Sequence, residues 1–288
     1  MVVNMKEKTL RGKLRIGIFL VFIFLTQVYS GIKISPVQVL VVSPTRSAAI
    51  KVHNPSETEE REMWVEVKYG YQTVDEKGGP HVVLLPADSG GERSAAQWLR
   101  PYPQRFVLQP SGVQIVRVVA APPSDLPDGE YWARVVISSK PTAPLRFKQK
   151  NQPTGVRSGF IMIEKADIPF HYRKGKLTTG LVIRNVTTTP GKDSMRVAVD
   201  LERTGNTSYW GTLTCRLKDH AGKIVSVFKK NLVVYKNETY LCFLKTVNVT
   251  SGEYTFEVNF NNTEGGETIR QYGAESESVN YSKSITLQ

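Results

Sequence analysis

Few side chains in this sequence are placed to do chemistry. The chain has two cysteines, Cys215 and Cys242, and four histidines that lie in four separate segments. It contains no Gly-x-Ser-x-Gly string and no His-Glu-x-x-His string, so neither a hydrolase nucleophile nor a helical zinc site is indicated. Two cysteines with scattered histidines also lack zinc-ligand spacing. We therefore expect no enzyme, no metal site, no cofactor and no small-molecule substrate; an undetected hydrolase is the weakest alternative.

The two cysteines leave two interpretations open. In an oxidising compartment, Cys215 and Cys242 could form a disulfide. They could equally stay as buried free thiols, because cysteine packs well as a small apolar side chain. A disulfide requires their Cα atoms to lie within about 7 Å, which the alternation of side chains does not reveal.

The first thirty residues have the order of a secretory signal peptide. Five basic residues precede an uninterrupted apolar run from Ile16 to Leu25, and Val28 and Ser30 suit the positions before a cleavage site. The apolar run is about half the length that a membrane-spanning helix needs, so cleavage is favoured over an uncleaved anchor. We expect residues 1–30 to direct export to the periplasm.

The net charge of the chain is +12, part of which belongs to this leader. Residues 1–30 hold five basic residues and one acidic residue, which leaves 33 basic and 25 acidic residues and a net charge of +8 beyond them. A basic surface favours acidic partners. No block of Lys and Arg is interleaved with aromatic residues, so no nucleic-acid partner is expected.

Beyond the leader the sequence reads as all-β. Short runs of alternating apolar residues are separated by turn residues, as in Met63–Tyr69 and Tyr131–Ile137. About seven such runs occur in the first half, the number in an immunoglobulin-type sandwich. The predicted strands are 37–42, 48–52, 63–69, 82–85, 105–108, 113–119, 131–137 and 159–163, then 177–184, 195–201, 211–217, 224–234, 240–247, 254–260 and 279–287.

This pattern predicts two tandem immunoglobulin-like β-sandwich domains behind the signal peptide. The first domain is expected over residues 31–174 and the second over 175–288, with the boundary near Arg173-Lys174-Gly175. Residues 139–156 are rich in Pro, Lys and Gln and are expected to form a long exposed loop inside the first domain.

A short string recurs late in each predicted domain. Gly129-Glu130-Tyr131 is followed by an alternating strand, and Gly252-Glu253-Tyr254 is followed by another. A Tyr at the start of such a strand suits a tyrosine corner, in which its hydroxyl bonds back to nearby backbone. The repeat favours two related domains over a chance match.

Several segments, read in order, resemble the periplasmic pilus-assembly chaperones. The segments are Leu99 to Val118 (LRPYPQRFVLQPSGVQIVRV), Leu126 to Tyr131 (LPDGEY) and Ile168 to Arg173 (IPFHYR). The resemblance covers about residues 32–174 and is weaker beyond. It implies an L-shaped pair of sandwiches that caps incomplete fibre subunits by lending them a strand, without ATP. The partners implied are protein subunits of a surface fibre, and an outer-membrane usher as a further candidate.

The best lending strand in this sequence is Gly159 to Ile163, continuing to Phe170. Phe160 and Met162 would face one way, and Ile161 and Ile163 the other. One set would pack on the protein's own core while the other enters a partner's groove, as in β-strand addition. An ordinary central strand with both sets self-buried is the alternative.

The resemblance fails at the pair of residues that anchors a subunit's terminal carboxylate in that family. The matching positions fall on or near Gln38 and Pro169, and neither is basic. Gln lacks the charge-assisted pairing of Arg, and Pro lacks even a backbone donor. The predicted function is therefore that of a divergent periplasmic chaperone, which assists folding and assembly of surface-fibre subunits by strand lending and does not share the family's basic carboxylate anchor. The alternative is an exported structural or adhesive protein that uses immunoglobulin-like domains as spacers.

Overall fold

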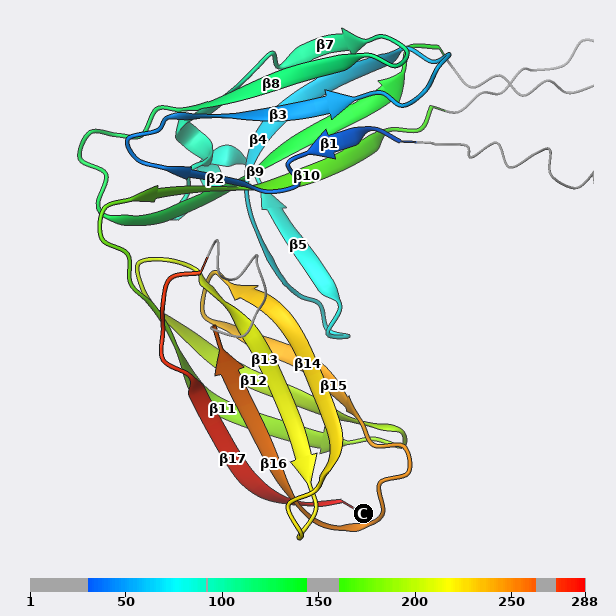
Figure 1. Ribbon diagram of the computed structural model, residues 1–288, viewed down its shortest axis with the longest axis vertical. Helices are drawn as coiled ribbons and strands as arrows, with labels where there is room; N and C mark the ends of the chain where they lie inside the picture. The colour runs from blue at the N-terminus through cyan, green and yellow to red at the C-terminus, as the bar shows by residue number, and fades with distance from the viewer. Residues whose placement is uncertain (1–30, 92, 144–160, 263–272, 288) are drawn as a thin grey trace, which may run out of the picture.

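The computed structural model describes residues 31–91, 93–143, 161–262 and 273–287. These residues form seventeen β-strands and two single-turn 3-10 helices, η1 (Ala87–Ser89) and η2 (Ala96–Trp98). The strands build two β-sandwiches in tandem (Figure 1). The all-β, two-sandwich prediction is confirmed, and the leader at 1–30 lies outside the described residues. No helix in the described ranges is long and apolar enough to cross a membrane.

The first sandwich packs a four-stranded sheet, in the order β1-β3-β8-β6, against a sheet in the order β2-β10-β9-β4-β5, with β7 also paired to β4. Its strands are β1 (Lys33–Ser35), β2 (Val39–Val42), β3 (Ser47–His53), β4 (Arg61–Val74), β5 (Pro80–Leu85), β6 (Leu99–Tyr102), β7 (Arg105–Leu108), β8 (Val113–Ala120), β9 (Gly129–Pro141) and β10 (Glu164–Lys174).

The core of the first sandwich lies between these two sheets. Ile50 of β3 and Val116 of β8 face Ile137 of β9 and Phe170 of β10, and all four are fully buried. They occupy alternate positions because successive side chains of a strand point to opposite faces. The alternation read from the sequence is thus the cause of the layered core.

The first strand of the chain is divided between the two sheets. β1 pairs antiparallel with β3, and β2 then pairs parallel with β10 in the opposite sheet. Pro36 lies between them, and proline has no N–H to continue a ladder. Because the chain changes sheets here, β2 pairs with only part of β10.

The second sandwich packs a three-stranded sheet in the order β11-β12-β15 against a four-stranded sheet in the order β14-β13-β16-β17. This is an immunoglobulin-like arrangement of seven strands. Its strands are β11 (Thr179–Pro190), β12 (Ser194–Gly205), β13 (Tyr209–Lys218), β14 (Ile224–Val234), β15 (Glu238–Lys245), β16 (Gly252–Asn261) and β17 (Val279–Leu287).

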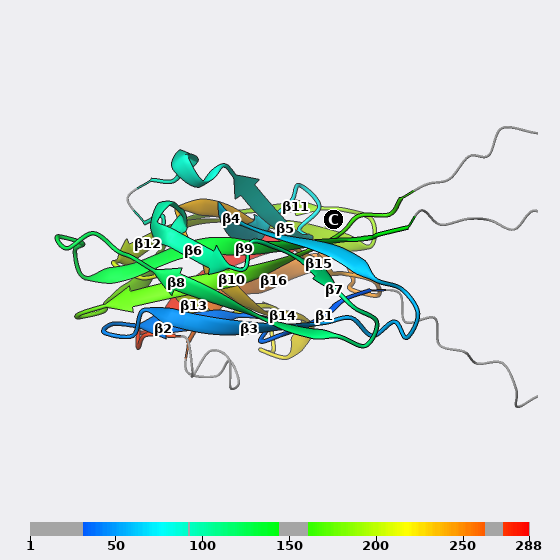
Figure 2. The same cartoon turned by 90° about the horizontal axis from the view of Figure 1, so that it is seen from above.

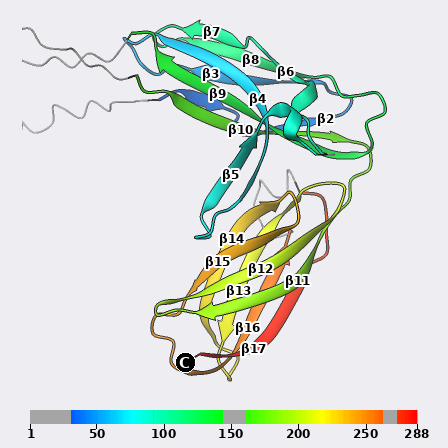
Figure 3. The same cartoon turned by 180° about the vertical axis from the view of Figure 1, so that it is seen from behind.

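The two sandwiches meet at one corner with their long directions at an angle (Figures 1 and 3). From above, strands of the first sandwich overlie those of the second (Figure 2). The second half of β4 and all of β5 leave the first sandwich as an arm that reaches the second (Figure 3). The arm joins the two domains at a second place, away from the chain connection.

Both predicted tyrosine corners are confirmed. The Tyr131 hydroxyl donates to the Pro127 carbonyl at 3.0 Å, and the Tyr254 hydroxyl donates to the Thr250 carbonyl at 2.7 Å. Each bond spans four residues at the start of the corresponding strand, β9 or β16. The Gly-Glu-Tyr repeat therefore marks equivalent places in the two domains.

Two predictions about the end of the first domain need correction. Ile161, Met162 and Ile163 are not in a strand, because β10 begins at Glu164. The β9–β10 ladder ends with Glu164 opposite Ser139, and β9 itself ends two residues later at Pro141, whose nitrogen cannot donate a ladder hydrogen bond. The predicted loop also starts later than residue 139, since Ser139 to Pro141 belong to β9.

Candidate functional site

One edge of β10 is only partly covered. Pairing with β9 extends along the whole strand from Glu164 to Lys174, whereas parallel pairing with β2 covers only Phe170 to Arg173. From Lys165 to Pro169, no strand in the described part of the chain pairs with the edge that faces away from β9. An open strand edge offers backbone donors and acceptors to another polypeptide.

Three residues with large apolar side chains immediately precede β10 in the chain. Ile161, Met162 and Ile163 are each 51% exposed. The alternative that both sets of side chains are self-buried is therefore wrong for these three residues. Phe160, the fourth residue of the predicted lending strand, lies outside the described residues. Continuing the alternation of β10, Met162 would share a face with the buried Ile168, and Ile161 and Ile163 would share the opposite face.

The two predicted anchor positions lie at the start of the same strand pairing. The parallel register begins with Phe170 opposite Val39, and Pro169 and Gln38 are the residues that immediately precede this first pair. The Nε2 atom of Gln38 is buried and has no hydrogen-bond partner among the described residues. Neither residue brings a charge to this position.

A basic residue that the sequence analysis did not single out lies on the neighbouring strand, opposite one of the two anchor positions. Arg134 of β9 is opposite Pro169 in the register, and its guanidinium donates to the Asp167 carboxylate at 2.9 Å. Its side chain is only 4% exposed. The sequence alone could not reveal that Arg134 lies opposite Pro169, because the two residues are far apart in the chain and only the β9–β10 register brings them together.

A buried carboxylate lies where the two domains meet. Glu130, at the start of β9, is fully buried and accepts from His171 Nδ1 at 3.1 Å and from Arg173 Nη2 at 2.6 Å. The Ser208 hydroxyl of the second domain also donates to Glu130, and Trp210 Nε1 donates to Ser208 Oγ at 2.7 Å. Glu130 thus holds basic groups of β10 and a polar group of the second domain together.

The environment of Glu130 keeps it ionised. Burial alone raises the pKa of the carboxyl, but His171, Arg173 and the Ser208 hydroxyl oppose it and lower the pKa to about 2. A carboxylate that accepts several charge-assisted bonds is stabilised in its charged form. These bonds hold the two domains together, and His171 is one of the residues that make them.

Aromatic rings fill the remainder of the joint. Tyr235, which follows β14, stacks on His171 with ring centroids 5.8 Å apart and meets Trp132 edge-on at 5.2 Å. Its hydroxyl lies 3.4 Å from His171 Nε2. Burial raises the pKa of Tyr235 well above its usual value, so the ring stays neutral. Such packed rings each bury a large apolar area.

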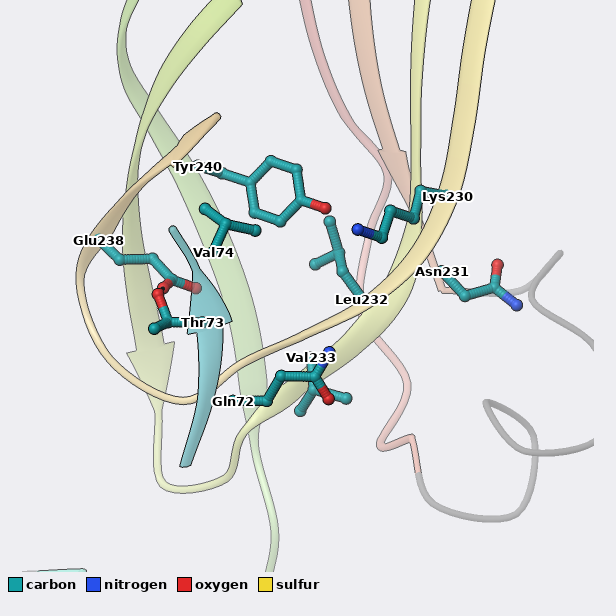
Figure 4. A pocket seen from close by; sticks show the side chains of 9 residues that line it. All are labelled: Gln72, Thr73, Val74, Lys230, Asn231, Leu232, Val233, Glu238 and Tyr240. Atoms are coloured by element: carbon teal, nitrogen blue, oxygen red, sulfur yellow. Dashed lines mark hydrogen bonds between the residues drawn. The ribbon is translucent and has the colours of Figure 1, made fainter. Parts of the chain in front are cut away.

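The β4–β5 arm makes the second junction between the domains. Thr73 of the arm donates to the Glu238 carboxylate of β15, and Figure 4 shows these two side chains side by side in a small pocket that Val74 and Tyr240 also line. Burial raises the pKa of Glu238, and the bond from Thr73 opposes that rise. The pocket is part of a packed junction between protein surfaces.

The remaining predicted residues lie elsewhere. Cys215 and Cys242 are buried in the second domain with their sulfur atoms 3.7 Å apart. Among the described residues, no group of three or more His, Cys, Asp or Glu side chains is arranged to hold a metal ion. The open β10 edge and the apolar residues before it are therefore the candidate site.

No model of a known protein family matches the chain, and no curated protein matches it. Matches are found among solved structures. One is the class 5 fimbriae chaperone CfaA, at 15% identity and a TM-score of 0.44, covering 88% of this chain and 99% of that one. Another is a chain of the CsuC–CsuE chaperone–tip adhesion subunit complex from Csu pili of Acinetobacter baumannii, at 12% identity and a TM-score of 0.43, covering 87% and 98%.

A third match is a chain of the Salmonella enterica SafA pilin–SafB chaperone complex, at 15% identity and a TM-score of 0.39, covering 87% and 95%. This chain is similar to pilus chaperones. Pilus chaperones are also the family that the sequence segments resemble, Leu126 to Tyr131 among them.

Proposed function

We propose that this protein is an exported chaperone that stabilises incomplete β-sandwich subunits of a surface fibre by lending them the open edge of β10. The lent segment runs from the apolar residues Ile161, Met162 and Ile163 into Lys165 to Pro169. The act is β-strand addition and involves no covalent chemistry.

The observation that carries the proposal is the coincidence of an open edge with exposed apolar side chains. β2 covers β10 only from Phe170 onward, and the three residues that precede β10 are each 51% exposed. A subunit that lacks a strand has the complementary defect, namely an open edge above a wet apolar groove. One lent segment would pair the backbone and fill the groove together.

The energetics favour apolar contacts and backbone pairing over a charged anchor. Burying one Ile or Met side chain contributes roughly 1.5–3 kcal/mol. Gln38 and Pro169 supply no positive charge, and the nearby Arg134 already pairs with Asp167. We therefore propose that a subunit's terminal carboxylate contributes little to binding here. An outer-membrane usher stays a predicted partner.

A co-purification experiment tests the proposal. The chain with its leader is co-produced in a bacterial periplasm with the fibre subunit encoded nearest to its own gene, and the complex is isolated and its affinity measured. Replacing Ile161 and Ile163 together by Asp, and separately Met162 by Asp, distinguishes the two faces of the segment. We expect at least one of these variants to weaken binding about 100-fold or more.

The matched control replaces Val227 and Val247 by Asp. These residues of the second domain are also apolar and are 58% and 56% exposed, so they test whether added negative charge alone disrupts the complex. The control should bind as the unchanged protein does, and all variants should keep the same circular dichroism and melting temperature. Unchanged affinity in both edge variants, or no complex at all, would overturn the proposal.

A further inference from the structure

The two cysteines of the chain face each other across the core of the second sandwich. Cys215 is on β13 and Cys242 is on β15, which belong to opposite sheets. Their exposed fractions are 0% and 2%. The two sulfur atoms lie 3.7 Å apart. Both side chains therefore point from opposite sheets to one place in the core.

We propose that Cys215 and Cys242 form a disulfide across this core when the chain folds in an oxidising compartment. Each thiol loses one hydrogen as the S–S bond forms, and the disulfide of a thiol oxidoreductase, or of glutathione, takes up both hydrogens and becomes two thiols. A bonded pair needs its sulfur atoms at about 2.05 Å, so the two side chains must close the remaining distance by small rotations.

The composition of the chain makes this pairing unambiguous. Cys215 and Cys242 are the only cysteines in all 288 residues, so an oxidised monomer has one possible disulfide. They are 27 positions apart in the chain. Cross-linking a loop of this length restricts the unfolded state and stabilises the fold.

The core environment indicates when the bond forms. The hydrogen bond between the Cys215 and Cys242 thiols raises the pKa of Cys215, and burial raises it further. Only the thiolate attacks a disulfide, and neither sulfur is open to a bulky oxidant in the closed sandwich. Oxidation must therefore precede the packing of the two sheets, and the finished disulfide is then shielded from reductants.

The first test counts thiols in the protein exported with its own leader. The purified chain is denatured, treated with a maleimide and weighed by mass spectrometry. We expect no maleimide on the exported monomer and a mass lower by two hydrogens than that of the reduced chain. The same chain without residues 1–30, made in a reducing cytosol, should take up two maleimides. Two reactive thiols in the exported monomer, or a disulfide-linked dimer in its place, would overturn the proposal.

The second test measures stability and order of events. The reduced form should melt roughly 10 °C or more below the oxidised form, and Cys215→Ala with Cys242→Ala should make melting indifferent to reductant. Glutathione disulfide should oxidise the reduced chain rapidly during refolding from urea and slowly when added to the folded chain. Equal melting temperatures would overturn the cross-link as a stabilising bond, and equal oxidation rates would overturn its formation before sheet closure.

Discussion

The same three residues, Gly-Glu-Tyr, begin β9 in the first domain and β16 in the second, yet they have different surroundings. Both tyrosines make the same corner bond to a carbonyl four residues earlier. Glu130 is fully buried at the domain joint, whereas Glu253, at the equivalent place in β16, is exposed. A local string thus sets a local turn, and the neighbours in space decide what its central residue does.

The largest difference is expected when the two glutamates are removed one at a time. Glu130→Ala leaves Arg173 and His171 buried without their carboxylate, which should cost about 3–5 kcal/mol of unfolding free energy. Glu253→Ala should change it by less than about 0.5 kcal/mol, as for most exposed positions. Urea unfolding followed by tryptophan fluorescence measures both. Equal effects at the two positions would break the comparison.

Acid should act on the first of these glutamates through its pKa. The folded pKa of Glu130, about 2, lies below the ordinary value of 4.5, so the unfolded chain binds this proton more readily. The stabilisation is complete above pH 4.5 and is lost as the pH falls toward 2. The free-energy gap between the unchanged protein and Glu130→Gln should therefore shrink by roughly 3 kcal/mol from pH 6 to pH 2.

This prediction is checked by urea unfolding of both proteins at a series of pH values. Other carboxylates titrate in the same range, but they contribute equally to both proteins and cancel in the difference. A gap that stays constant with pH would show that Glu130 does not carry the charge assigned to it at the joint.

The smallest effects should be the same in the two domains. Tyr131→Phe and Tyr254→Phe each remove one hydroxyl-to-carbonyl bond and leave the ring in place. Each should lower the unfolding free energy by about 1 kcal/mol. Thermal unfolding measures both variants, and the two losses should agree within experimental error. A loss at only one position would mean that the corners are equivalent in geometry but not in energy.

The predicted lending segment shows where alternation is an incomplete guide. Ile161, Met162 and Ile163 alternate as strand residues do, but a strand also needs a neighbour's backbone to pair with. In the folded chain that pairing begins only at Glu164. The strand predicted for these three residues from their alternation was wrong, because pairing is a property of two segments and alternation is a property of one.

Some features of this protein were readable from the sequence alone. The all-β class, the two domains and the two tyrosine corners follow from period-two alternation and from turn residues at fixed offsets, which act over a few positions of the chain. The tertiary structure alone decided that Glu130 meets Ser208, 78 positions away, that Arg134 lies opposite Pro169, and that the two thiols face each other. These contacts depend on strand register and domain packing, which bring together residues that no local pattern connects.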